Sequence, residues 1–360
     1  MGRTVAFLSF RFGATDGVSV VARSWMDVFA EDGWHVLTVT GEPTDATSWP
    51  ARVVPGLGLE ATVASSDLVG PLADSLEDVD LVVVENLLTI PMNLEASRAA
   101  ATVLAGRPAL LHHHDPPWHR ERFAHITELP ATDPAWRHVA INSILAGELA
   151  QRGIDATVVH NGFAPPPHRS AEQRGDLRRH VRSQVGLPTH GAVLAHPVRA
   201  IERKNVPAAI ALAEAVGATY WLLGPAEEGY ERELAALLRD ARCPVVHHPW
   251  PEPEGIYAAA DHIVFPSTWE GFGNPPIEAA LHRRTVSVGD YPVATELRSH
   301  GFDWFAADDA ASVRAVLDEP DAPAVTELLD RNEAVARRDF SIEHMAGRLR
   351  SVLDAAGWWT

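Results

Sequence analysis

The sequence predicts an α/β protein with two Rossmann-like domains. Short runs of β-branched and apolar residues alternate with segments whose apolar residues recur at helical spacing, a pattern typical of parallel sheets with crossover helices. A chain of 360 residues is long enough for two domains, each with its own core. The pattern breaks at the proline-rich residues 162–167, where we expect the linker between the domains.

The predicted elements run in order through both domains. Strands are expected at residues 4–10, 34–40, 80–86, 109–111, 139–142 and 156–159, then at 192–196, 219–223, 244–248, 262–265 and 285–288. Helices are expected at residues 18–30, 94–104, 171–184, 230–238, 255–260 and 342–356, and Asn93 is the expected N-cap of the second. The first turn lacks a full G-x-G-x-x-G pattern, so a dinucleotide site is poorly supported there.

Composition narrows the classes of partner and compartment. The formal net charge of −18 disfavours nucleic acid and anionic membranes, because both are bound through basic surfaces. No apolar run approaches the roughly 20 residues that span a bilayer, and no signal-peptide pattern follows the first strand. A single cysteine, Cys243, excludes an internal disulfide. We therefore expect a cytoplasmic protein without a transmembrane segment.

A run of histidines, His112-His113-His114, follows a predicted strand and leads into Asp115 and Trp118. Consecutive side chains on an extended segment point to alternating sides, so these histidines cannot all face one ion. The sequence therefore predicts no metal site here. At the end of a strand, such a cluster more naturally supplies hydrogen-bond donors and acceptors for sugar hydroxyls, with an aromatic wall beside them.

Arg199 and Lys204 follow the first strand of the second domain, on a loop that enters a helix. A guanidinium and an ammonium at this spacing can grip two phosphates and neutralise a leaving diphosphate. Lys204 is the sole lysine in a chain whose other basic residues are all arginine, which suggests that a compact point charge is needed there. Chance is the alternative explanation of a lone lysine.

The most informative stretch is residues 265–278, a strand end, a glycine-rich turn and a helix start. Gly271 and Gly273 let a ligand approach backbone N–H groups and the positive end of a helix dipole. The carboxylates of Glu270 and Glu278 bracket the turn. A nucleotide sugar needs donors for its phosphates and acceptors for its hydroxyls, so the stretch suggests a sugar-nucleotide site. The alternative is that Glu278 stabilises its own helix and Glu270 is a solvated loop residue.

The string Pro-Ser-x-x-Glu-Gly-Phe-Gly-Asn-x-x-x-Glu-Ala resembles the donor-site motif of retaining glycosyltransferases of family 4. That resemblance implies the GT-B fold, in which two Rossmann-like domains face each other across a cleft and the last helix crosses back to the first domain. It implies an acceptor domain at residues 1–162, a donor domain at 163–340 and a returning C-terminal helix at 341–360.

The resemblance also implies roles for individual residues. Glu270 would contact the transferred sugar and Glu278 the ribose, Arg199 and Lys204 would hold the diphosphate, and His114 would lie against the transferred sugar. The remaining donor contacts would be Gly17, Gly271, Phe272, Gly273 and Asn274. The acceptor contacts would be Asp16, His113 and Asp115. Asp16 replaces a glycine of the family's first loop, and an acid there repels phosphate but accepts hydrogen bonds from hydroxyls.

The motifs around Asp16, His114, Glu270 and Tyr291 look most like the branch of mannosylglucosylglycerate synthases and related mannosyltransferases. That branch implies transfer of mannose from GDP-mannose to a soluble saccharide or glycoside with retention. No divalent metal is required by this scheme, although stimulation by Mg²⁺ stays open, as does the oligomeric state. The alternatives are a UDP-glucose or UDP-N-acetylhexosamine transferase, a GT-B epimerase acting without acceptor, a phosphorylase using inorganic phosphate, and a non-catalytic glycan- or transferase-binding partner.

Overall fold

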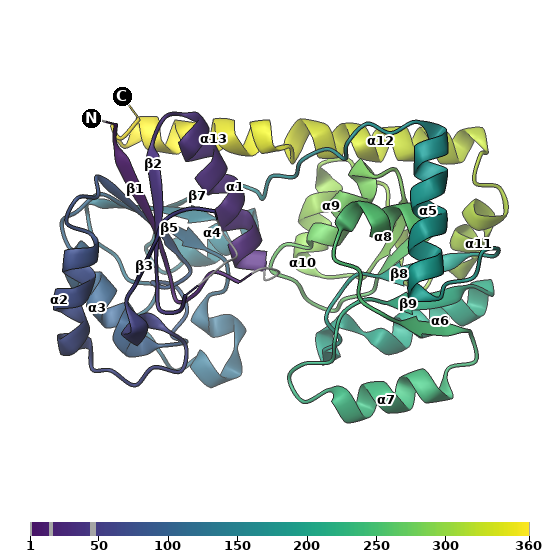
Figure 1. Ribbon diagram of the computed structural model, residues 1–360, viewed down its shortest axis with the longest axis horizontal. Coiled ribbons are helices and arrows are strands. Elements are labelled where there is room, and N and C mark those ends of the chain that lie inside the picture. The colour runs from purple at the N-terminus through teal and green to yellow at the C-terminus, as the bar shows by residue number, and fades with distance from the viewer. Residues whose placement is uncertain (1, 14–16, 44–47, 360) are drawn as a thin grey trace. The chain divides into compact units, whose positions relative to one another are not determined.

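The computed structural model describes residues 2–13, 17–43 and 48–359, which divide into two compact α/β units (Figure 1). Unit 1 comprises Met1–Gly162 and Ile342–Thr360, and unit 2 comprises Phe163–Ser341. Each unit is built from a parallel sheet and the helices that cover it.

Unit 1 has a parallel sheet with strand order β3-β2-β1-β4-β5-β6-β7 among the described residues. Its strands are β1 Thr4–Ser9, β2 His35–Thr40, β3 Ala51–Val53, β4 Leu81–Glu85, β5 Ala109–His113, β6 Trp136–Ala140 and β7 Ala156–Val158. Its helices are α1 Gly17–Glu31, α2 Ser65–Ser75, α3 Leu94–Leu104, α4 Ser143–Ala150 and α13 Ile342–Ala355. The strand order reverses between β1 and β4, which makes their carboxyl ends the expected ligand edge of this sheet.

Unit 2 has a second parallel sheet, with the described strands in the order β10-β9-β8-β11-β12-β13. These strands are β8 Val193–His196, β9 Thr219–Leu222, β10 Val245–His247, β11 His262–Phe265, β12 Thr285–Val288 and β13 Phe305–Ala306. The helices are α5 Ala171–Val185, α6 Val206–Val216, α7 Glu231–Asp240, α8 Pro253–Ala259, α9 Asn274–Leu281, α10 Pro292–Ser299, α11 Ala310–Asp318 and α12 Pro323–Asp339. The order reverses between β8 and β11, so this sheet too has one switch point.

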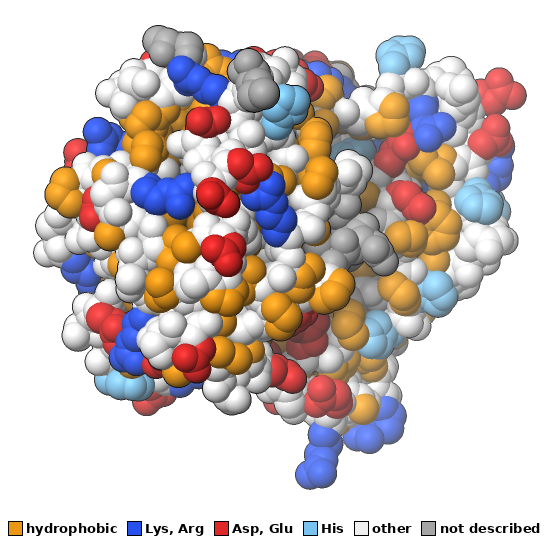
Figure 2. All heavy atoms as spheres, turned by 60° about the vertical axis from the view of Figure 1, so that its left-hand side comes forward, with side chains coloured by type: hydrophobic (Ala, Val, Ile, Leu, Met, Phe, Trp, Pro, Cys, Tyr) orange, Lys and Arg blue, Asp and Glu red, His pale blue; other side chains and the backbone are white. Residues whose placement is uncertain are grey.

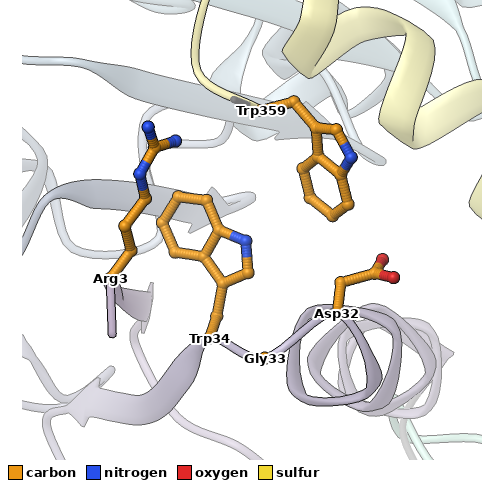
Figure 3. Close-up of a pocket in the computed structure, with 5 residues that line it drawn as sticks. All are labelled: Arg3, Asp32, Gly33, Trp34 and Trp359. Atoms are coloured by element: carbon orange, nitrogen blue, oxygen red, sulfur yellow. The ribbon is translucent and has the colours of Figure 1, made fainter. Parts of the chain in front are cut away.

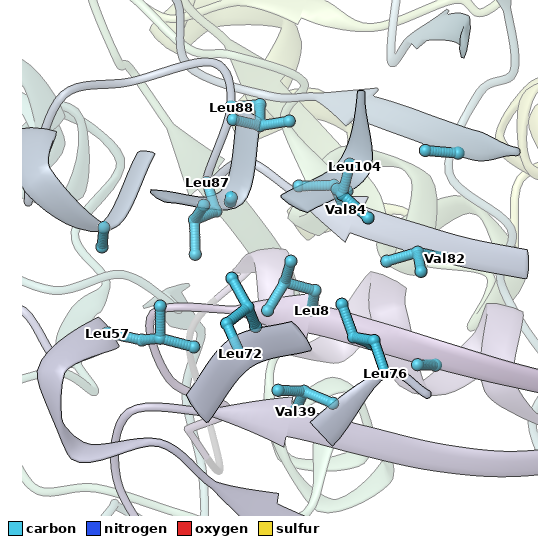
Figure 4. Close-up of a cluster of buried hydrophobic side chains, with 14 of the residues drawn as sticks. Leu8, Val39, Leu57, Leu72, Leu76, Val82, Val84, Leu87, Leu88 and Leu104 are labelled. Carbon is cyan, nitrogen blue, oxygen red and sulfur yellow. The ribbon is translucent and has the colours of Figure 1, made fainter. Parts of the chain in front are cut away.

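Two apolar clusters hold the sheet of unit 1 between its helices. On one face, side chains such as Leu8 and Val84 pack against Leu72 of α2 and Leu104 of α3 (Figure 4). On the other face, Phe7 packs in a cluster that also contains side chains of α1 and α13. Helix α13 is therefore part of the core of unit 1, although it is far from the rest of that unit in the sequence.

The second half of α13 and the residues that follow it contact the first segments of unit 1. The indole of Trp359 stacks on Trp34 with ring centroids 6.2 Å apart, and Arg350 forms an ion pair with Asp32 at 2.7 Å. Arg3 donates a hydrogen bond from Nη1 to the Trp358 carbonyl oxygen at 2.5 Å. Figure 3 shows how Trp34, Trp359, Asp32 and Arg3 lie around a shallow pocket. These contacts join the C-terminal residues to Arg3, which precedes β1, and to the turn between α1 and β2.

The surface carries charges of both signs. On the face drawn in Figure 2, acidic and basic side chains of the described residues lie interspersed. No helix within the described ranges is both long and apolar enough to cross a membrane.

Candidate active site

The switch point of unit 2 brings together two loops that are far apart in the sequence. The chain leaves β8 at His196 and reaches Lys204, while the chain that leaves β11 at Phe265 reaches Glu270. Because β8 and β11 are parallel neighbours, both loops start from the same edge of the sheet. The order of the strands therefore explains why these two residues meet.

Lys204 and Glu270 form a buried ion pair. Lys204 Nζ lies 2.5 Å from Glu270 Oε1, and Arg203 Nη1 lies 2.8 Å from Glu270 Oε2. Glu270 is 6% exposed and Lys204 is 9% exposed. Arg203 also donates to the Trp269 carbonyl oxygen at 3.0 Å, which ties it to the start of the turn. Both oxygens of one carboxylate are thus held by cations.

The opposite charges of this cluster offset the effect of burial on each other's pKa. Burial by itself would raise the pKa of Glu270, but Lys204 and then Arg203 outweigh it and hold that pKa below its usual value. Burial lowers the pKa of Lys204, and the Glu270 carboxylate opposes that shift. The site therefore holds an ionised carboxylate beside fixed positive charge, an environment suited to a ligand with both phosphates and hydroxyls.

Arg199 does not join this cluster in the structure. Its guanidinium pairs with Glu227 at 2.5 Å, and its side chain is 52% exposed. Arg203 instead contacts Glu270 beside Lys204, a contact that the sequence did not predict, and the diphosphate contact predicted for Arg199 stays a prediction. The adjacency of Arg203 to Lys204 was the available signal. Asn205, next along the chain, has a positive φ of 53° and caps α6 through its side chain, which fixes the turn that brings Arg203 and Lys204 together.

The turn before α9 is shaped by glycine and proline. Gly273 has a φ of 100°, and a Cβ there would lie 2.8 Å from the Tyr291 hydroxyl oxygen. Pro275 and Pro276 in the first turn of α9 carry no N–H, so the amide donors near this helix start come mainly from residues 271–274. Phe272 is buried, with Phe163 and Phe340 as ring neighbours. The side chain of Phe272 therefore fixes the turn, and any donor contact would come from its backbone.

Glu278 lies on α9 beyond its first turn, so it does not act there as the first-turn acid of the alternative explanation. The Tyr257 hydroxyl donates to Glu278 Oε2 at 2.6 Å. Burial raises the pKa of Glu278, against the effect of that hydrogen bond. The carboxylate keeps acceptor capacity beyond its bond to Tyr257, which is compatible with a hydroxyl-binding role.

A close backbone contact between Gly289 and Ser267 supports the turn that carries Glu270. A Cβ built on Gly289 would lie 2.1 Å from the Ser267 carbonyl oxygen, and the Gly289 N–H donates to the Phe265 carbonyl at 2.9 Å. We expect Gly289→Ala to lower the free energy of unfolding by about 1–3 kcal/mol, because backbone must move to admit the methyl group. Urea unfolding would measure this loss.

Gly175 in α5 of the same unit provides the control for that substitution. A Cβ there would meet the flexible end of Arg179 at 3.3 Å and no backbone atom. Gly175→Ala should leave stability equal or raise it by roughly 0.5–1 kcal/mol through helix propensity. Equal behaviour of the two variants would contradict the close backbone contact at Gly289.

The predicted residues of unit 1 that the structure describes, among them Gly17, His113 and His114, lie near the switch point of its sheet. Glu85 ends β4, and the Ser9 hydroxyl at the end of β1 donates to its carbonyl oxygen at 3.2 Å. Asp16 lies outside the described residues, and Gly17 is the first residue of α1. His113 and His114 come at the end of β5 and directly after it.

The histidines alternate along the strand as expected. His113 faces one side, where Nδ1 lies 2.7 Å from the Thr89 hydroxyl and Nε2 lies 2.9 Å from His138 Nδ1. His112 and His114 face the other side, where both contact Glu85. Burial lowers the pKa of His113 well below its usual value. His113 is therefore held by the protein itself, which leaves its predicted acceptor contact a prediction.

Asp115 follows as a half-buried residue. Asn86 donates from Nδ2 to Asp115 Oδ2 at 3.3 Å, and its own Oδ1 accepts from the backbone N–H groups of His114 and Asp115. Asn86 has a positive φ of 62°. This side chain fixes the segment that carries the predicted acceptor residues.

Among the described residues, one group of side chains could hold a metal ion, and it consists of Glu85, His112 and His114. Glu85 Oε2 lies 3.0 Å from His112 Nδ1 and 3.1 Å from His114 Nε2. Burial lowers the pKa of His112, and the contacts with His112 and His114 lower the pKa of Glu85 against the effect of its own burial. The prediction of no metal site rested on the three histidines alone, and the register of β4 and β5 that brings Glu85 beside two of them was not predicted.

Comparison with known proteins finds sequences that are similar to this chain over most of its length. No known protein-family profile matches it. The mannosylglucosylglycerate synthase of Thermotoga maritima is 21% identical over 420 aligned residues, covering 95% of this chain and 97% of that protein. The enzyme of the same name from Petrotoga mobilis is 24% identical over 367 residues, covering 80% of this chain and 83% of its own.

Among solved structures, HepE of Anabaena in complex with UDP-glucose superposes with a TM-score of 0.78 at 19% identity. The superposition covers 98% of this chain and 99% of HepE. The chain has the GT-B fold. That confirms the predicted fold, and over most of its length the chain is similar in sequence to the two mannosylglucosylglycerate synthases. The family number and the roles of single residues remain predictions.

Proposed function

We propose that this GT-B chain is a retaining hexosyltransferase that transfers mannose from GDP-mannose to a soluble saccharide or glycoside. The observation that carries the proposal is the buried ion pair of Lys204 and Glu270, with Arg203 beside it, at the switch point of unit 2. It combines fixed cations for a diphosphate with an ionised acceptor for sugar hydroxyls. The names of the two mannosylglucosylglycerate synthases favour a mannosyl donor.

Each residue of the proposed site has a separate role in the reaction. The bond between the anomeric carbon and the diphosphate oxygen breaks, and the acceptor oxygen forms its bond on the face that the diphosphate leaves. Lys204 and the amides of the Gly271–Asn274 turn stabilise the departing negative charge. The leaving oxygen takes the acceptor's proton. Glu270 and His114 position the transferred sugar, and no step requires a divalent metal.

A second donor deserves testing because HepE was solved with UDP-glucose. The electrostatics around Lys204 recognise a diphosphate and not a base, so they suit both donors equally. The expected result is that GDP and GDP-mannose, and not their uridine counterparts, raise the melting temperature of the chain. At 100 times its dissociation constant a ligand adds about 2.7 kcal/mol of stability, which shifts a domain of this size by several degrees.

The measurement is a thermal-shift panel of GDP, UDP, ADP and their hexose conjugates, each with and without Mg²⁺. A shift with the uridine compounds alone would reject mannosyl transfer in favour of glucosyl or N-acetylhexosaminyl transfer. Turnover of the donor without an acceptor would favour an epimerase, and a requirement for inorganic phosphate would favour a phosphorylase. No shift with any nucleotide would contradict the enzyme proposal and favour a non-catalytic binding partner.

A further inference from the structure

A carboxylate is buried without a cationic side chain at the switch point of unit 1. Glu85 has no exposed surface, and within the described residues no Lys or Arg forms an ion pair with it. Its carboxylate contacts the imidazoles of His112 and His114. A carboxylate taken out of water is costly unless positive charge compensates it. The compensating charge at Glu85 must therefore come from these two imidazoles or from a bound cation.

The backbone holds three donor groups at a separation that suits one ion. Glu85 and His112 are register partners on the parallel strands β4 and β5, and His114 lies two residues further on the same side. Their ligand atoms all lie within 4.8 Å of one another. Zn²⁺ binds such atoms at about 2.0–2.2 Å, so that neighbouring ligands on one ion lie roughly 3–3.5 Å apart. The two oxygen-to-nitrogen distances of 3.0 and 3.1 Å fall at that separation.

The chemistry of the three ligand groups indicates which class of metal ion they would bind. Imidazole nitrogen suits zinc and its neighbours among the transition metals, whereas Mg²⁺ and Ca²⁺ prefer oxygen ligands. Two histidines and a glutamate occur as a ligand set in zinc sites that keep a further position open. We propose that Glu85, His112 and His114 bind a divalent transition-metal ion, with Zn²⁺ as the first candidate.

Neighbouring side chains fix the proposed ligands. The indole of Trp25 stacks on the His112 ring, with centroids 3.9 Å apart and an angle of 13° between the planes. His112 Nε2 is buried and has no hydrogen-bond partner in the described part of the chain, so the stack replaces the hydrogen bond that usually orients a metal-bound imidazole. Asn86 Oδ1 accepts a hydrogen bond from the backbone N–H of His114 at 3.2 Å.

The ion would also set the chemistry of His114. Binding through Nε2 places the ring proton on Nδ1, which makes the side chain a hydrogen-bond donor towards a ligand. The ion would thus join the ends of two strands and orient the segment that carries Asp115. This role is independent of the donor nucleotide in the proposed function, so the two proposals fail separately.

The test measures metal on the full chain, expressed without an oligohistidine tag. Wild-type protein is equilibrated with Zn²⁺, dialysed against metal-free buffer and analysed by elemental mass spectrometry. About one zinc ion per chain is expected, as for a site with three protein ligands. Glu85→Gln removes the charge while keeping the side-chain shape and should lose the ion. His138→Asn, a change to a histidine on the opposite side of the sheet next to His113, should keep it.

A Co²⁺ titration provides a second readout in case Glu85→Gln does not fold. Wild-type chain and His138→Asn should develop the visible absorption of nitrogen- and oxygen-bound Co²⁺ at low coordination number, and Zn²⁺ should abolish it. A hundredfold excess of Mg²⁺ should leave it unchanged. Wild-type protein that retains no zinc and shows no such absorption would overturn the proposal. Equal zinc retention by folded Glu85→Gln would do the same, because the ion would then sit on other histidines.

Discussion

Replacing Lys204 by alanine is expected to lower kcat by about 10²–10³-fold, the usual effect of removing one charged contact that strengthens in the transition state. The ammonium lies at the end of the β8 loop and is the positive charge nearest to the buried carboxylate of Glu270. In the proposed reaction it neutralises the departing diphosphate. The measurement is initial-rate kinetics at saturating donor, once the nucleotide panel has identified that donor.

Stability and catalysis must be separated in this variant, because Lys204 is also half of a buried ion pair. Arg203 still contacts Glu270 after the substitution, so the carboxylate keeps one cation. Urea unfolding of Lys204→Ala shows whether the chain is folded at the assay temperature. Lys204→Arg restores a positive charge and should recover part of the rate, provided that it folds.

Arg242→Ala is the matched control in the same unit. Arg242 pairs with Glu214, and its side chain is 85% exposed, so its loss should change neither stability nor rate beyond the small effect of a surface ion pair. Lys204→Ala with the turnover of the wild-type enzyme would refute the role proposed for this residue. A rise in KM with unchanged kcat would instead mean that Lys204 binds the donor equally well in the ground state and the transition state.

The sequence predicted the strands of both sheets except β3 and β13, because buried parallel strands are short, continuous apolar runs. Helix α2 escaped prediction for a physical reason: it contains Gly70 and Pro71 and buries only Leu68 and Leu72, so its pattern is weak. Strand β3 is three residues long and lies at the edge of the sheet, where no apolar run is needed. Such elements are defined by their neighbours and not by their own composition.

The candidate site also depends partly on local motifs and partly on the order of the strands. Lys204 and Glu270 were each predicted from a local motif, but their ion pair depends on β8 and β11 being neighbours in the sheet. Glu85 meets His112 because of the register of β4 and β5, which a single sequence does not contain. Local motifs therefore identified the loops, whereas the strand order decided which side chains share a charge.

Replacing Glu270 by glutamine is expected to lower the free energy of unfolding by about 3–5 kcal/mol, the usual cost of breaking a buried ion pair from one side. The loss arises because Lys204 stays buried beside a neutral amide. Urea unfolding followed by circular dichroism measures it. Asp303→Asn, which breaks an exposed pair with Arg331, is the control and should cost about 1 kcal/mol or less.

A double variant, and then a pH series, test whether the loss of stability in Glu270→Gln comes from the lost charge. In Glu270→Gln/Lys204→Met neither charge remains, so the double variant should lose less stability than the sum of the single losses. Additive losses would contradict direct coupling between the two side chains, which lie 2.5 Å apart.

The pH dependence has a definite sign. Because the pKa of Glu270 is lowered in the folded chain, its contribution is complete above its unfolded value of about 4.3 and is lost as pH falls through the folded value. Protonation of the wild-type carboxylate removes the same charge that the glutamine variant lacks. The difference in stability between the wild-type chain and Glu270→Gln should therefore shrink as the pH is lowered below about 4. A difference that stays constant over that range would mean that the loss comes from packing and not from the ion pair.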